Sequence, residues 1–124
     1  MTAERLRPRV LVVDDEPAIR LLCRVNLELD GYVVLEAASL AEARAVLRDD
    51  VVDVVLLDLH LGRERSDELI EELHGRTPPV PVAFVTGSTD EASAQQAGAD
   101  GVLSKPFAIE DLAATVRRLV GAAE

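Results

Sequence analysis

Short apolar runs alternate along the chain with longer segments in which apolar residues recur at helical spacing. The runs have no polar residue at every second position, so they are typical of strands that are buried on both faces. Strands that alternate with helices in this way predict β-α units wound into a parallel sheet. We expect five strands, at residues 10–13, 32–35, 54–57, 82–85 and 102–103.

The stretches between these runs carry start and stop signals for five helices. Proline suits the first helical position, a Ser-x-x-Glu sequence forms a capping box, and glycine commonly follows the last turn. These signals predict helices that begin at Pro17, Ser39, Ser66, Ser88 and near Ile109, with Gly31, Gly98 and Gly121 at the ends of the first, fourth and fifth. We expect a single domain over residues 1–124, with an ordered core from about residue 8 to 121.

Composition and charge narrow the classes of function. The chain has 124 residues, 48% of them hydrophobic, which is enough for the core of one domain. Its formal net charge of −10 would repel a phosphate backbone, so direct nucleic-acid binding is not expected. The apolar runs are much shorter than a membrane span and the N-terminus has no signal-peptide core, which predicts a cytoplasmic protein with no membrane partner. The single cysteine, Cys23, lies on a helical apolar stripe and is expected to be buried.

Side chains able to carry chemistry follow the predicted strands at the point where each strand ends. Asp14 and Asp15 follow the first strand, Asp58 the third, Thr86 the fourth and Lys105 the fifth. Because the carboxyl ends of parallel strands share one edge of a sheet, these side chains should converge there.

Such a cluster would suit phosphoryl chemistry. Three neighbouring carboxylates repel one another and attract a cation, and oxygen ligands with room for water and a phosphate suit Mg²⁺. Lys105 offers a charge for one phosphoryl oxygen, and the Thr86 hydroxyl can donate a hydrogen bond to another. One carboxylate would then be the nucleophile that forms an aspartyl phosphate.

The same residues sit in four motifs that occur in a recognisable order. The motifs are Val10-Leu-Val-Val-Asp14-Asp15-Glu16-Pro17, Val54-Val-Leu-Leu-Asp58-Leu59, Val85-Thr86-Gly87 and Ala97-Gly-Ala-Asp-Gly101-Val-Leu-Ser-Lys105-Pro106-Phe107. Together they resemble the receiver domains of two-component response regulators over nearly the whole chain. The resemblance implies an α/β fold of the flavodoxin-like type, a doubly wound five-stranded parallel sheet in the order 2-1-3-4-5 with five flanking helices.

The resemblance also implies how an ion and a phosphoryl group would be held. Asp58 is the expected phosphoacceptor and a ligand of Mg²⁺, the expected cofactor. Asp15 is expected to bind the ion directly and Asp14 through a water molecule. The backbone carbonyl of His60 is a further expected ligand.

Two more roles and the partners follow from the same resemblance. Thr86 is expected to be the switch hydroxyl that moves toward the phosphoryl group, and Lys105 its counter-charge, with a cis peptide bond to Pro106. The donor would be a sensor histidine kinase or a histidine phosphotransfer protein. The domain would assist its own phosphorylation and dephosphorylation without being an enzyme in its own right. Its output would be a change in protein contacts, with a downstream protein or a homodimer as candidate partners.

The chain departs from the receiver pattern at two places, which keeps other interpretations open. Gly62 stands where receivers commonly have proline, with Arg63-Glu-Arg-Ser66 where they have Asp-Gly, and Leu103 stands where they have an aromatic residue. One alternative is therefore an interaction scaffold that has lost phosphorylation. Another is a phosphatase of the haloacid-dehalogenase type, which predicts an Asp-x-Asp pair after the first strand and a cap insertion. Here Asp14-Asp15 is followed by Glu-Pro, and no insertion is found.

Overall fold

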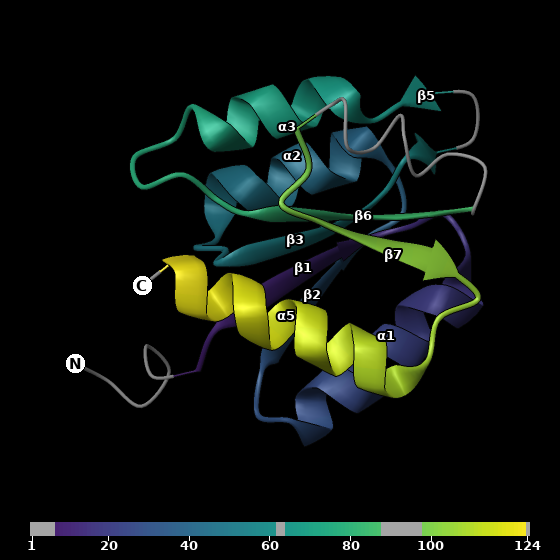
Figure 1. Ribbon diagram of the computed structural model, residues 1–124. Helices are drawn as coiled ribbons and strands as arrows, with labels where there is room; N and C mark the ends of the chain where they lie inside the picture. The colour runs from purple at the N-terminus through teal and green to yellow at the C-terminus, as the bar shows by residue number, and fades with distance from the viewer. Residues whose placement is uncertain (1–6, 62–63, 88–97, 124) are drawn as a thin grey trace.

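The computed structural model describes residues 7–61, 64–87 and 98–123, which form a five-stranded parallel sheet with flanking helices (Figure 1). The strands are β1 (Arg9–Val13), β2 (Val33–Ala37), β3 (Val54–Asp58), β6 (Val82–Gly87) and β7 (Gly101–Lys105). They lie side by side in the order β2-β1-β3-β6-β7. The predicted order 2-1-3-4-5 is confirmed, because β6 and β7 are the fourth and fifth strands of this sheet.

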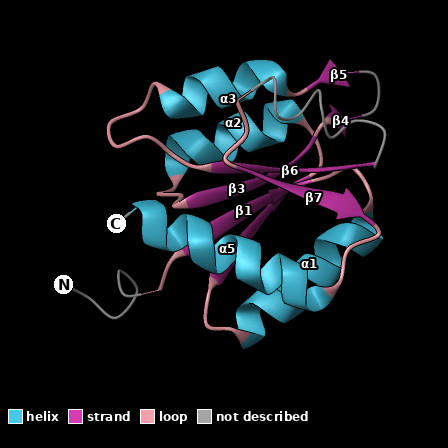
Figure 2. Cartoon of the chain, in the orientation of Figure 1, coloured by secondary structure: helices cyan, strands magenta, loops and turns pink. Residues whose placement is uncertain are grey.

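The helices that the structure describes cover both faces of the sheet (Figure 2). The first face carries α2 (Leu40–Asp49) and α3 (Asp67–His74), and the second carries α1 (Pro17–Leu29) and α5 (Ile109–Ala123). Alternate residues of β3 divide between these faces: Val55 and Leu57 pack in the α2/α3 layer, and Val54 and Leu56 in the α1/α5 layer. Every residue of β3 is buried, which explains why the strand is an unbroken apolar run.

Local sequence signals set the ends of the first two helices. Pro17 is the first residue of α1, as predicted, and Gly31 follows that helix with a φ of 94°, a conformation that glycine adopts without strain. At α2, the Ser39 hydroxyl accepts a hydrogen bond from the Glu42 N–H at 3.1 Å. The Glu42 carboxylate in turn accepts one from the Ala38 N–H at 3.0 Å, so the predicted capping interaction is confirmed.

The structure differs from the sequence prediction at the end of α5 and in the loop after β3. α5 continues to Ala123, past the predicted stop at Gly121. Glycine ends a helix where the chain needs a positive φ, and among the described residues only Gly31 and Gly98 have one. A two-stranded antiparallel ribbon, β4 (His60–Leu61) paired with β5 (Glu64–Arg65), forms where the sequence predicted a plain polar loop.

The helix that was predicted to begin at Ser88 falls outside the residues that the structure describes. None of the described helices is long and apolar enough to span a membrane.

Candidate functional site

Strand register brings the predicted site residues to one edge of the sheet. β1 and β3 pair with Val13 opposite Leu57, so the next residues along the two strands are Asp14 and Asp58. On the other side of β3, β6 carries Thr86, and β7 ends at Lys105. The convergence that was predicted from the strand ends is therefore confirmed.

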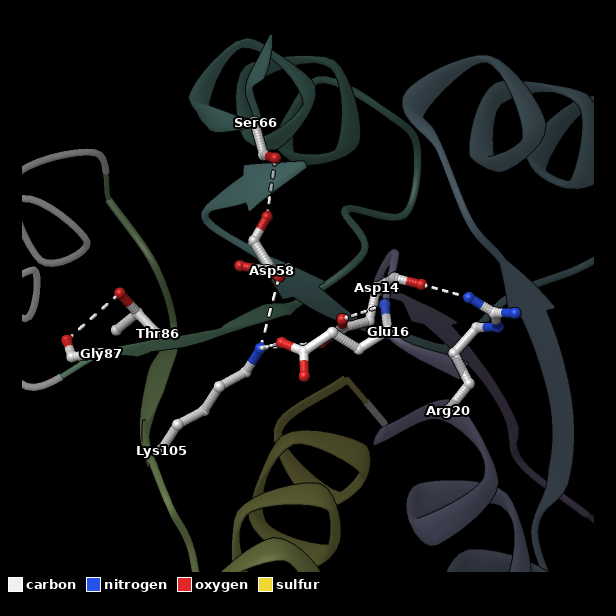
Figure 3. A network of polar contacts seen from close by, with 8 residues as sticks. All are labelled: Asp14, Glu16, Arg20, Asp58, Ser66, Thr86, Gly87 and Lys105. Carbon is white, nitrogen blue, oxygen red and sulfur yellow. Dashed lines mark hydrogen bonds and ion pairs between the residues drawn. The ribbon is translucent and has the colours of Figure 1, made fainter. Parts of the chain in front are cut away.

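Four carboxylates gather at this edge, three of which are drawn in Figure 3. Asp14, Asp15, Glu16 and Asp58 each offer an oxygen, and these oxygens all lie within 4.8 Å of one another. Asp14 and Asp58 are buried, at 2% and 8% exposed, whereas Asp15 and Glu16 are exposed to solvent. The cluster is thus buried on the sheet side and accessible from the solvent side, which lets a small hydrated ion or a phosphoryl donor approach.

Lys105 balances the charge of this cluster. Its Nζ lies 3.2 Å from Asp14 Oδ2, 3.2 Å from Glu16 Oε1 and 3.4 Å from Asp58 Oδ2. Partial burial opposes the ammonium charge, but the carboxylates of Asp14 and then Asp58 outweigh that cost and raise the pKa of Lys105 above its ordinary value. The side chain is therefore a permanent cation beside the predicted phosphoacceptor.

Backbone and side-chain contacts orient Asp14. Its Oδ1 accepts a hydrogen bond from the Glu16 N–H at 2.9 Å, and its backbone carbonyl accepts one from the Arg20 guanidinium at 2.7 Å. Asp14 Oδ2 is buried and accepts no hydrogen bond of good geometry within the described residues, so its compensation is the ion pair with Lys105. A buried carboxylate oxygen with spare acceptor capacity, next to three further carboxylates, is a donor set that suits a hard divalent ion such as Mg²⁺.

The Thr86 hydroxyl is turned away from the carboxylates. It donates to the Gly87 carbonyl at 3.3 Å, and Figure 3 shows it pointing to the side opposite Asp58. Thr86 is buried at the end of β6, so its side chain can reach the cluster only by rotating within the fold. The predicted movement of this hydroxyl toward a phosphoryl group stays a prediction.

The remaining sequence expectations have mixed outcomes. The cis bond between Lys105 and Pro106 is confirmed. His60 begins β4, two residues after Asp58, and its carbonyl as a metal ligand stays a prediction. Leu103 is buried in the α1/α5 layer. Gly62 and Arg63 lie outside the described residues.

The sequence interpretation missed two residues of the site. Glu16 contributes a carboxylate to the cluster and an ion pair to Lys105, and the signal that could have identified it is the unbroken acidic run after β1. Ser66 donates a hydrogen bond from Oγ to the backbone carbonyl of Asp58 at 2.7 Å. Its position was interpreted as a helix start, and nothing in the local sequence points to this tertiary contact.

The chain has many relatives of known sequence. The family model of the response regulator receiver domain matches residues 10–117. The chain is 38% identical over 121 residues to the transcriptional regulatory protein KdpE of Mycobacterium tuberculosis, covering 93% of this chain and 54% of KdpE. It is 35% identical over 115 residues to the response regulator MprA of the same species, covering 90% of this chain and 50% of MprA. The chain thus spans about half the length of the curated relatives that it matches.

Solved structures agree with this assignment. A CheY-like receiver domain protein from Methanospirillum hungatei superposes with a TM-score of 0.83 at 29% identity, covering 94% of this chain and 96% of that one. The receiver domain of NtrX from Brucella abortus gives a TM-score of 0.82 at 30% identity, covering 90% and 98%. With the sheet order, the acidic edge and the family match in agreement, the chain belongs to the response regulator receiver domain family.

Proposed function

We propose that this domain accepts a phosphoryl group on Asp58 in the presence of Mg²⁺ and changes its protein contacts as a result. The observation that supports this proposal most directly is the contact set of Asp58. Its carboxylate lies at the end of the central strand, inside an acidic cluster and 3.4 Å from the Lys105 ammonium. Membership of the receiver family is the second support.

The transfer step requires few groups. A carboxylate oxygen of Asp58 forms a bond to phosphorus while the bond from phosphorus to the donor breaks, and the bonding electron pair leaves with the donor. The bond that breaks is a P–N bond when the donor is a phosphohistidine. It is a P–O bond when the donor is a small acyl phosphate, and a carboxylate is then the leaving group. The product is an aspartyl phosphate, which carries more negative charge at the site than the carboxylate did.

Each neighbouring group has a distinct task in this proposal. Asp14, Asp15, Asp58 and the His60 carbonyl would hold the Mg²⁺, which supplies positive charge for the phosphoryl oxygens. Lys105 exchanges its ion pair with Asp58 for one with a phosphoryl oxygen. The long hydrogen bond of Thr86 to Gly87 is weak enough to be exchanged for one to the phosphoryl group.

We propose a sensor histidine kinase or a histidine phosphotransfer protein as the donor, in the cytoplasm. The relatives named as response regulators support this choice. The net charge of −10 favours protein contacts over direct DNA contacts as the output of this domain itself. A homodimer stays a prediction.

An interaction scaffold without phosphorylation is the second candidate. One observation favours it: Leu103 lies two residues before the site lysine, where the resemblance leads us to expect an aromatic ring. The acidic cluster and its lysine partner are nevertheless both present, and they favour the phosphoacceptor.

Acetyl phosphate with Mg²⁺, followed by intact mass measurement, tests the proposal. Wild type should gain one phosphoryl group, and Asp58→Asn should gain none. Asp49→Asn removes an exposed carboxylate at the end of α2 and should behave as wild type, which controls for the loss of charge. If wild type gains no phosphoryl group and also fails to bind beryllofluoride, the scaffold is the better interpretation.

A further inference from the structure

Ser66 is tied to the backbone of the strand end that carries Asp58. Its hydroxyl donates to the Asp58 carbonyl at 2.7 Å, and its N–H donates to the Leu59 carbonyl at 3.2 Å. The residue is fully buried, at 0% exposed, so water does not compete for either contact. Ser66 thus holds two adjacent carbonyls, those of Asp58 at the end of β3 and of Leu59 directly after it, and Figure 3 draws the contact with Asp58.

The Ser66 hydroxyl does not serve the helix that it precedes. Serine before a helix usually accepts a hydrogen bond from an N–H of the first turn, as Ser39 does at α2. Ser66 precedes α3 with φ −99° and ψ −1°, and its side chain makes no such cap. Its backbone carbonyl accepts from the Leu69 N–H at 3.1 Å, so the residue belongs to the start of α3 while its hydroxyl is directed to Asp58.

Asp58 is the last residue of β3, and its pairing with Val85 is the last pair between β3 and β6. The next ladder contact, from the Leu59 N–H to the Val85 carbonyl, is long at 3.4 Å. A hydrogen bond to the Asp58 carbonyl fixes the peptide unit that follows Asp58, and the two peptide units that flank the Cα atom together set the direction in which the side chain leaves the backbone. The carboxylate lies 3.4 Å from Lys105 Nζ, so a small rotation would move it out of reach of this partner.

We propose that Ser66 is a positioning residue for the phosphoacceptor. It fixes the orientation of the Asp58 carboxylate and connects that orientation to the first turn of α3. This inference rests on the proposed function, because it assigns Ser66 to the phosphoryl transfer at Asp58. A displacement of Asp58 by its new phosphoryl group would be transmitted through the same contact to α3.

Ser66→Ala removes the hydroxyl and is the principal test. We expect the rate of phosphorylation by acetyl phosphate, at saturating Mg²⁺ and well below the unfolding temperature, to fall about fivefold to tenfold. Ser66→Cys keeps the size and offers only a weak donor, so its rate should lie between those of wild type and Ser66→Ala. The fold of each variant is checked by circular dichroism. If the alanine variant does not fold, the cysteine variant provides the test.

Ser39→Ala is the matched control, because it removes a serine hydroxyl that caps α2 and does not contact Asp58. Its phosphorylation rate should stay within about twofold of wild type although the cap is lost. Equal rates in wild type and the folded Ser66 variants would overturn this inference alone. Equal slowing in Ser39→Ala and Ser66→Ala would overturn it as well, because general loss of stability would then explain the effect. Failure of wild type to be phosphorylated would instead overturn the proposed function, and this inference with it.

Discussion

Replacing Lys105 by methionine should weaken the fold in a way that Mg²⁺ reverses. The substitution keeps an apolar stem and removes the ammonium that lies 3.2 Å from Asp14 and 3.4 Å from Asp58. Both carboxylates are buried, and the substitution takes away the ammonium that contacts both of them. A divalent ion bound to the same oxygens would supply that charge again.

The expected size of the effect follows from the geometry. One ion pair at 3.2 Å is worth about 1.3 kcal/mol at the dielectric constant of water. Removing one partner of a fully buried pair costs about 3–5 kcal/mol. The Lys105 side chain is 22% exposed, which places this site between the two limits. We therefore expect a loss of about 2 kcal/mol in the free energy of unfolding, or about 8 °C in Tm.

Urea unfolding with and without Mg²⁺, at constant ionic strength, measures this effect. Without Mg²⁺ the gap between wild type and Lys105→Met should be about 2 kcal/mol, and saturating Mg²⁺ should at least halve it. The control is Arg44→Met, which breaks an ion pair with Glu72 whose side chains are 38% and 52% exposed. Arg44→Met should lower the free energy of unfolding by less than about 1 kcal/mol, and by the same amount with and without Mg²⁺. A gap for Lys105→Met that Mg²⁺ leaves unchanged would refute the reasoning.

Five further outcomes are expected. Phe84→Ala removes a fully buried ring from the α2/α3 layer and should lower the free energy of unfolding in urea by about 3–5 kcal/mol. A loss below about 1 kcal/mol would contradict the packing of Phe84 in this layer. Cys23 is buried as predicted and its burial raises its pKa from 9.0 to about 11, so a thiol reagent should label it only after unfolding. Since the unfolded thiol ionises before the folded one, stability should fall as pH rises from 9.0 to about 11, and Cys23→Ala should lack this component. Thr86→Val should still gain the phosphoryl group but lose the shift of backbone amide resonances that follows phosphorylation in wild type. A shift equal to that of wild type would exclude the switch role of Thr86. Lys105→Ala should likewise be phosphorylated with a weaker response, measured by the shift of backbone amide resonances, and a shift equal to wild type would exclude its role as counter-charge.

The sequence predicted the sheet well because its strands carry the strongest signal in the chain. Val54 to Leu57 is a continuous apolar run, and a strand with this composition is stable only when both of its faces are covered. Placing Asp58 after such a run also located it at the carboxyl edge without knowledge of any contact. The order of the strands in the sheet could not be predicted from local sequence, because pairing between distant segments leaves no local signal. The predicted order came from the family resemblance.

The features that sequence did not predict depend on tertiary contacts or on very short elements. Serine before a helix is typical of a helix cap, but the Ser66 hydroxyl donates to a carbonyl eight residues earlier. Whether the hydroxyl caps the helix or makes this tertiary contact is decided only in the folded chain. The strands β4 and β5 have two residues each, too few for any periodicity to show. Glu16 could have been included with Asp14 and Asp15, since nothing in the sequence separates it from them.

The burial of β3 has a mechanical consequence for signalling. A strand that is covered on both faces and paired on both sides cannot tilt or slide without opening two hydrophobic layers together. The backbone of β3 that leads to Asp58 therefore stays in place when the charge of Asp58 changes. The rearrangement falls on the groups around it: the hydroxyl of Thr86, the stem of Lys105 and the segment that leads into α3. The strand is thus a fixed base for the reacting carboxylate, and the signal is the displacement of the groups around that carboxylate.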